Sequence, residues 1–99
     1  MSSTPPSSSH TLTLPERLDY AACETLAKDI AAKAGTPLQL EATSVRFLGA
    51  LAAEIILRGQ AEWASQELPF WVSDRSEAFT NGLQNLGIPE NAINQEGGA

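Results

Sequence analysis

An alternating apolar segment that leads into a long amphipathic helix is the feature that most constrains the fold of this chain. In residues 38–42, apolar side chains alternate with Gln39 and Glu41, a period of two that is typical of a strand with one covered face. From Gly49 onward the period becomes that of a helix. The residues that fall on its inward face are Ala52, Ile55, Ile56, Gly59 and Trp63.

The outward face of this helix carries charge and one misplaced leucine. Glu54, Arg58 and Glu62 are spaced four apart, so the arginine can pair with either glutamate. Leu51 falls on the same outward face in the first turn, so it points away from the protein core that the helix covers. Either another segment covers Leu51, or this side chain contacts a partner.

A strand-to-helix unit precedes this central segment. A short strand at residues 11–14 is stopped by Pro15, which cannot donate in a ladder. The helix that follows has Asp19 as its predicted N-cap and Gly35 as its left-handed stop. On its exposed side, two pairs have the i, i+4 spacing of ion pairs, Glu24 with Lys28 and Asp29 with Lys33.

A similar unit follows the central segment. Residues 68–72, LPFWV, predict a buried strand, and Ser73, Asp74 and Ser76 are N-cap candidates for the next helix. Gly82 inside that helix predicts close packing against a neighbouring element, because a glycine there weakens the helix by itself. Its apolar stripe is predicted as Phe79, Leu83 and Leu86, with Gly87 as the stop.

Strand and helix signals thus alternate in the order β-α-β-α-β-α, which predicts an α/β fold. We expect a single-domain sandwich with right-handed crossovers, a mainly parallel sheet of about three to four strands and about three to four helices. The domain is predicted to span residues 11–88. Residues 1–10 are rich in serine and proline and predict a disordered tail, and residues 89–99 predict a frayed end.

Charge and composition restrict the partners of this chain. The 99 residues carry a net charge of −6 and no basic cluster, which argues against binding nucleic acid. No apolar run approaches the roughly 20 residues of a membrane span, and no secretory signal is visible, so direct membrane insertion is not expected. The single Cys23 excludes an internal disulfide and suits a reducing cytoplasm.

The motifs of common enzymes are absent from the sequence. It contains no G-x-G-x-x-G, P-loop, G-x-S-x-G or C-x-x-C pattern. His10, the single histidine, lies in the predicted tail with no second ligand nearby, so no metal site is expected. Cys23 falls on the apolar side of a helix and is interpreted as a small core residue. The sequence therefore predicts no catalytic residue and no cofactor.

Residues 40–57, LEATSVRFLGALAAEIIL, resemble the central signature of the STAS domain, the fold of anti-sigma factor antagonists. In that family an apolar strand leads through a serine-rich turn into an apolar helix. Val45, Phe47 and Leu48 occupy the positions of the second apolar cluster of the family.

Two further segments support the resemblance. Residues 11–26, TLTLPERLDYAACETL, are similar to the first strand-to-helix unit of the family, and residues 76–88, SEAFTNGLQNLGI, are similar to its closing helix. The resemblance covers about residues 11–88. Members of the family usually carry one more strand before the first one found here, and we expect this chain to have lost it.

The turn before the central helix departs from the family pattern. In regulated members it reads Asp-Ser-Ser-Gly, and a partner kinase phosphorylates one of its serines. Here the turn reads Gly49, Ala50, Leu51, Ala52, so both the acceptor hydroxyl and the capping aspartate are missing. We therefore expect no phosphoacceptor at this turn, while Thr43 and Ser44 remain as less favoured acceptors.

The resemblance implies a non-enzymatic regulatory adaptor that binds a protein partner in bacterial signal transduction, with a role similar to that of an anti-sigma factor antagonist or of a chemotaxis-associated STAS protein. The partner would be an anti-sigma kinase or a chemotaxis component. The alternative implied by the family is an accessory subunit of a lipid or anion transport system that binds a ligand or nucleotide. The predicted partner-binding residues are Gly49, Ala50, Leu51, Glu54 and Arg58.

Overall fold

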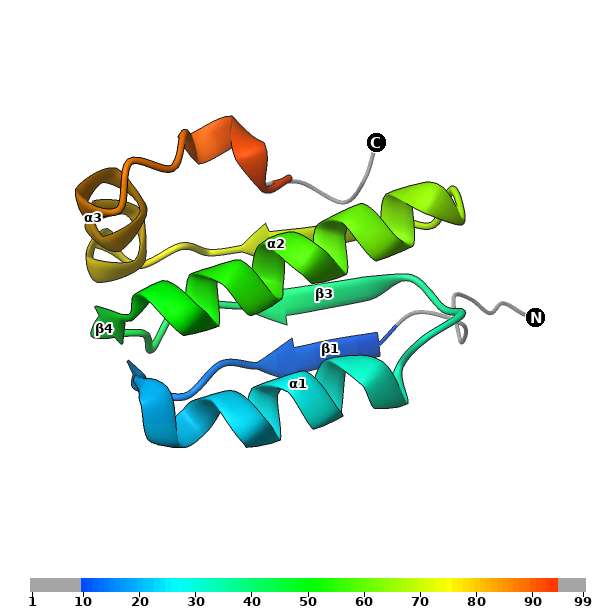
Figure 1. Ribbon diagram of the computed structural model, residues 1–99, viewed down its shortest axis with the longest axis horizontal. Coiled ribbons are helices and arrows are strands. Elements are labelled where there is room, and N and C mark those ends of the chain that lie inside the picture. The colour runs from blue at the N-terminus through cyan, green and yellow to red at the C-terminus, as the bar shows by residue number, and fades with distance from the viewer. Residues whose placement is uncertain (1–9, 95–99) are drawn as a thin grey trace.

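Three parallel strands form the main sheet of the computed structural model, which describes residues 10–94 (Figure 1). In spatial order they are β1 (His10–Thr13), β3 (Leu38–Glu41) and β5 (Phe70–Ser73). Both neighbouring pairs are parallel, with Leu12 opposite Leu40 and Leu40 opposite Val72. The predicted α/β class with a mainly parallel sheet is therefore confirmed.

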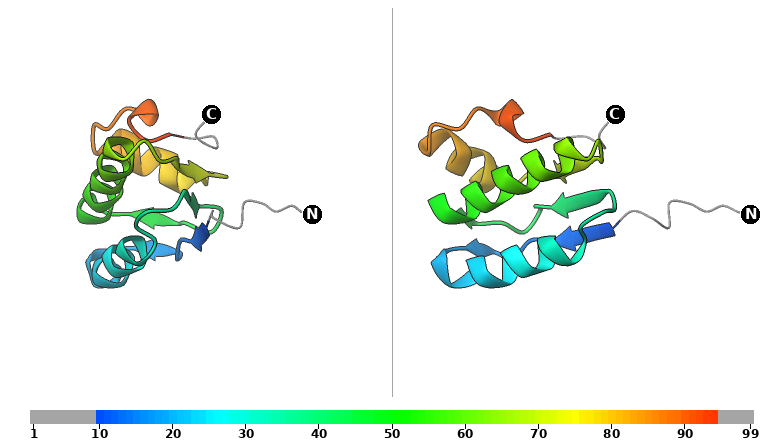
Figure 2. Two further views of the ribbon diagram at one scale, coloured as in Figure 1. Left: turned by 90° about the vertical axis from the view of Figure 1, so that its right-hand side faces the viewer. Right: turned by 45° about the vertical axis from the view of Figure 1, so that its right-hand side comes forward.

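Helices α1 (Cys23–Ala32) and α2 (Ala50–Ser65) cover the same face of this sheet (Figures 1 and 2). Right-handed crossovers between strands that are neighbours in sequence and in space require this arrangement. Helix α3 (Glu77–Asn85) lies past the carboxyl ends of the strands, against β4. In the described part of the chain no helix covers the opposite face, which presents Thr11, Thr13, Gln39, Glu41, Trp71 and Ser73.

The core lies between the main sheet and these helices. The inward face of α2 is buried largely as predicted, since Ala52, Ile56, Gly59 and Trp63 are buried and Ile55 is half-buried. From the sheet side, Leu38, Leu40, Phe70 and Val72 complete this layer.

A second, two-stranded parallel sheet joins the segments that follow β1 and β3. Its strands are β2 (Arg17–Leu18) and β4 (Phe47–Leu48). Beyond them, the amide of Gly49 donates to the carbonyl of Leu18 at 2.9 Å. The sequence did not predict these strands, because two residues are too few for a periodic signal. Their pairing holds the start of α2 beside the segment that enters α1.

The residues predicted to mark helix ends lie at those ends, although Asp19 caps a 3₁₀ turn that leads into α1, whose own N-cap is Ala22. The Asp19 carboxylate accepts a hydrogen bond from a backbone amide in the 3₁₀ turn η1 (Tyr20–Ala22), which runs into α1. The Ser76 hydroxyl caps α3 in the same way. Gly35 and Gly87 have φ values of +89° and +74°, the left-handed conformation that commonly follows a helix.

Gly82 packs closely against β4, as predicted from its place inside a helix. A Cβ atom at this position would lie 2.8 Å from the Cβ of Leu48. Gly59 of α2 is similar, because a Cβ there would lie 2.9 Å from the Phe70 ring. Each glycine therefore lets its helix approach a neighbouring element more closely than alanine would allow.

The frayed end predicted from residue 89 onward is wrong as far as residue 94. The chain forms a 3₁₀ turn, η2 (Glu90–Ala92), and Ile93 is then fully buried at 0% exposure. Asn94 bonds to β5, since its carbonyl accepts from the amide of Val72 at 2.8 Å. One apolar side chain and the free edge of β5 are enough to hold this segment, and neither gives a periodic signal in the sequence.

Three smaller expectations are also corrected. His10 belongs to β1, because its amide donates to the carbonyl of Pro37 at 3.0 Å, and is not a tail residue. Leu86 ends the stripe of α3 but is 38% exposed, since it lies at the C-cap. Asp29 and Lys33 do not form the expected ion pair among the described residues.

The remaining predictions about the chain ends fall partly outside the structure. β1 begins at His10, the first described residue, so the expected loss of an earlier strand stays a prediction. The predicted tail at residues 1–9 and the last residues, 95–99, lie outside the described part of the chain.

Candidate protein-binding surface

The turn that begins α2 is shaped by a close approach of backbone and side chains. Gly49 is the N-cap residue, with φ −88° and ψ 167°, and has no side chain to cap the helix. A Cβ atom at this position would lie 3.1 Å from the carbonyl oxygen of Leu18 and 3.3 Å from the Phe47 ring. A capping aspartate would therefore push against both neighbours, which gives a physical reason for glycine here.

Four large apolar side chains within residues 10–94 are exposed, and all of them surround this turn. They are Tyr20 at 82% exposure, Phe47 at 42%, Leu51 at 40% and Leu86 at 38%. Single exposed apolar residues are common on protein surfaces, but their concentration around one turn is not explained by chance exposure alone. Together with Gly49 and Ala50, these four residues are called the α2 entry surface below.

One half of the α2 entry surface is a hollow between α1 and α2. It has a volume of about 420 Å³. Leu51 and Tyr20 line it from its outer side, and Ile55 and Cys23 lie deeper. The leucine that the helix period placed on the wrong face is therefore exposed, and it borders an apolar depression.

The other half is a hollow between α2 and α3, with a volume of about 480 Å³. Phe47 and Leu86 border it, and Gly49, Ala50 and Gly82 lie in it without large side chains. The two hollows are separated by the first turn of α2, so a partner that covers this turn can enter both.

Charged side chains of opposite sign rim the two hollows. Arg46 lines the hollow beside α3, and the Arg17 guanidinium lies 5.2 Å from the centre of the Phe47 ring, in cation–π contact. Glu24 lines the hollow beside α1. An apolar centre with a charged rim is the usual anatomy of a protein-binding surface.

The structure separates the predicted site residues into two groups. Gly49, Ala50 and Leu51 belong to the α2 entry surface. Glu54 and Arg58 lie further along the exposed face and bind one another, with 2.7 Å between the Glu54 carboxylate and the Arg58 guanidinium. An exposed pair of this kind contributes little to stability, about 0.3–0.5 kcal/mol, and can exchange for contacts with a partner.

Sequence reasoning missed three members of this surface, Tyr20, Phe47 and Leu86. Tyr20 and Phe47 reach the two sides of the first turn of α2 because β2 pairs with β4, a contact between two very short strands. Leu86 was assigned to the core by its spacing from Leu83.

The chemistry available in the described residues is limited. Burial raises the pKa of the Cys23 thiol, and the nearby Asp19 carboxylate raises it further. The thiol donates to the Asp19 carbonyl at 3.3 Å, so Cys23 is a packed, protonated side chain. Within residues 10–94 no three histidine, cysteine, aspartate or glutamate side chains gather as a metal site.

Thr43 and Ser44, the remaining candidate phosphoacceptors, lie in the loop between β3 and β4. Both are exposed, and the Thr43 hydroxyl donates to the Glu41 carboxylate. A phosphate on Thr43 would lie beside this carboxylate, so like-charge repulsion disfavours it.

Compared with known protein families and with curated proteins, the chain matches none. Among the helices of the described chain, none combines the length and the apolar character that a membrane crossing needs.

Proposed function

We propose that this protein is a non-enzymatic regulatory adaptor of bacterial signal transduction, which binds a protein partner through the α2 entry surface. The observation that carries the proposal is the convergence of four exposed apolar side chains on the first turn of α2. The resemblance to STAS domains supports a partner of the anti-sigma kinase or chemotaxis type, and a compartment in the cytoplasm.

Contacts at the first turn of α2 would supply both apolar and polar binding energy. Burial of one leucine side chain is worth ~1.5–3 kcal/mol, enough for a ten-fold or larger change in affinity. The turn also has no acidic residue and no side-chain cap, so its amides can donate hydrogen bonds to a carboxylate or carbonyl group of the partner. Regulation would depend on partner binding, because the turn has no hydroxyl for a phosphate.

Replacing Leu51 with aspartate is expected to weaken partner binding by ten-fold or more, on the order of 1.4 kcal/mol, without loss of the fold. An aspartate in the first turn of a helix interacts favourably with the helix dipole, so the variant should melt near the wild-type temperature. Arg58→Glu should have a smaller effect, because Arg58 lies outside the α2 entry surface.

The measurement requires the partner to be captured first. A photo-crosslinking amino acid at position 51, expressed in the native cells, should link one protein, and the same group at exposed position 61 should not. Calorimetry with that protein then compares Leu51→Asp with Ala61→Asp, a matched charge change two turns or more away on α2. Equal affinities for these variants would contradict the proposed surface, and a collapsed melt for Leu51→Asp alone would assign Leu51 to the core.

A further inference from the structure

The strand β1 has one bonded edge and one free edge in the described chain. The amides of His10 and Leu14 donate toward β3, at 3.0 and 2.9 Å. In a parallel ladder the residues between them direct their N–H and C=O groups the other way, so Thr11 and Thr13 present donors and acceptors at the outer edge. Within residues 10–94, β3 is the strand that pairs with β1, and nothing pairs with this outer edge.

The opposite edge of the sheet, at β5, is covered by the chain itself. There the Asn94 carbonyl accepts from the amide of Val72 at 2.8 Å, and the Asn94 side-chain amide donates to the carbonyl of Phe70 at 3.2 Å. The molecule therefore closes the β5 edge with its own chain. Within residues 10–94 the outer edge of β1 stays open, and an open edge is a template for an added strand.

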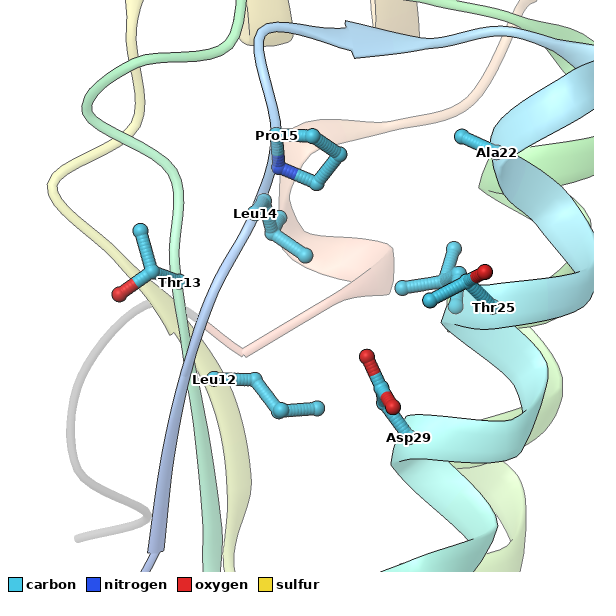
Figure 3. Close-up of a pocket in the computed structure, with 8 residues that line it drawn as sticks. Leu12, Thr13, Leu14, Pro15, Ala22, Thr25 and Asp29 are labelled. Atoms are coloured by element: carbon cyan, nitrogen blue, oxygen red, sulfur yellow. The ribbon is translucent and has the colours of Figure 1, made fainter.

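An apolar groove runs beside the free edge of β1. It has a volume of about 240 Å³ and lies between β1 and α1 (Figure 3). Leu12, Leu14 and Pro15 line it from the strand side. On the helix side it is lined by Leu26 of α1 and Ala22 of η1, with the polar Thr25 and Asp29, and Thr13 borders it from the strand. A strand added to β1 would direct every second side chain toward this groove, because side chains alternate between the two faces of a sheet.

A carboxylate without an ion-pair partner stands at this groove. Asp29 is spaced to pair with Lys33, yet no ion pair to Asp29 forms among residues 10–94. Glu24, on the same helix, does pair with Lys28 at 3.6 Å. The Asp29 carboxylate is exposed and directed toward the space beside Leu12 (Figure 3), so it is available to a cation from outside.

We propose that the free edge of β1 and the adjoining groove bind an extended, basic segment of a partner protein by strand addition. The backbone of the segment bonds to Thr11 and Thr13, one apolar side chain enters the groove, and a lysine or arginine two residues away pairs with Asp29. Pro15 has no N–H and ends the ladder, so the bound motif is short.

Charge selects this occupant over a second copy of the chain. Each copy carries a net charge of −6, and pairing two β1 edges would bring together two Asp29 carboxylates across short strands. A basic partner segment is instead attracted to the Asp29 carboxylate at the groove. It is also attracted by the net negative charge of the whole protein.

The proposal is tested by selecting phage-displayed random peptides on the immobilised full-length protein. The expected consensus is an apolar residue and a lysine or arginine two positions apart. The affinity of a selected synthetic peptide is then measured by fluorescence anisotropy. Thr13→Pro should weaken it at least about ten-fold, because proline removes an outward-facing donor while edge strands tolerate it. Thr13→Ala, the matched control, should change it less than about two-fold.

Charge reversal gives a second, independent readout. Asp29→Lys should weaken the basic peptide, and the same peptide with glutamate in place of its basic residue should regain affinity for this variant. If Thr13→Pro does not fold, as judged by its thermal melt, Thr11→Pro takes its place.

The proposal is overturned if no such consensus is selected or if the peptides ignore both substitutions. It is also overturned if Leu51→Asp, in place of Thr13→Pro, abolishes their binding, which would assign them to the α2 entry surface. A dimer in sedimentation that Thr13→Pro dissociates would identify a second copy as the occupant and would likewise overturn it.

Discussion

Replacing Trp63 with alanine is expected to lower the free energy of unfolding by about 3–5 kcal/mol, a large fraction of the stability of a domain of this size. Trp63 is 2% exposed, and its ring centre lies 5.3 Å from that of Phe70 at an angle of 53°. Its indole N–H donates to the carbonyl of Thr36 at 2.6 Å. The side chain thus ties the end of α2 both to β5 and to the loop that leads from α1 into β3.

Trp63→Phe separates the two contributions of this side chain. Phenylalanine keeps most of the ring packing but leaves the Thr36 carbonyl without its donor, so we expect a smaller loss, about 1–3 kcal/mol. Urea denaturation followed by circular dichroism measures both variants at an unchanged slope with denaturant. A midpoint for Trp63→Ala that stays at the wild-type value would show that the indole does not support the core.

The parts of the fold that the sequence predicted are those in which many residues repeat one period. The sequence of α2 has apolar residues on one face over several turns. The sequence of β3 alternates between apolar and polar residues, and that of β5 is strongly apolar. Local chemistry was also informative at single positions. The cap at Asp19 and the close packing at Gly82 could each be predicted. Aspartate is a preferred N-cap residue, and a glycine inside a helix usually has a packing reason.

The parts that could not be predicted depend on contacts between distant segments. The strands β2 and β4 are two residues long, and only their mutual pairing makes them strands. This pairing brings Tyr20 and Phe47 to the first turn of α2, so these two members of the α2 entry surface lay beyond any local pattern. Leu51 was the exception. Its position conflicted with the helix period, and such a conflict can be seen in a sequence without knowledge of the fold.

The segment that follows α3 also depends on contacts with distant parts of the chain, and these contacts contribute to stability. After Pro89 this segment has one large apolar residue, Ile93, which stands between Ala92 and Asn94, so no periodicity marks it as part of the core. Ile93 is nevertheless fully buried, and hydrogen bonds from Arg75 hold the backbone around it. The Arg75 guanidinium donates to the carbonyls of Glu90, Ile93 and Asn94, and burial lowers the pKa of this side chain while Glu90 opposes the change.

Replacing Ile93 with alanine is expected to cost about 2–5 kcal/mol, because a cavity would open where this side chain packs and the polar ties alone cannot refill it. Ile93→Val removes one methylene and should cost about 0.5–1.5 kcal/mol, which provides a graded control at the same site. Both values follow from chemical denaturation. Hydrogen exchange adds a local test, since the amide of Val72 bonds to Asn94 and should lose protection in Ile93→Ala before the amides of β3 do. A loss for Ile93→Ala smaller than the about 0.5–1.5 kcal/mol expected for Ile93→Val would contradict this prediction. It would show that the segment is frayed in solution, as its sequence alone suggests.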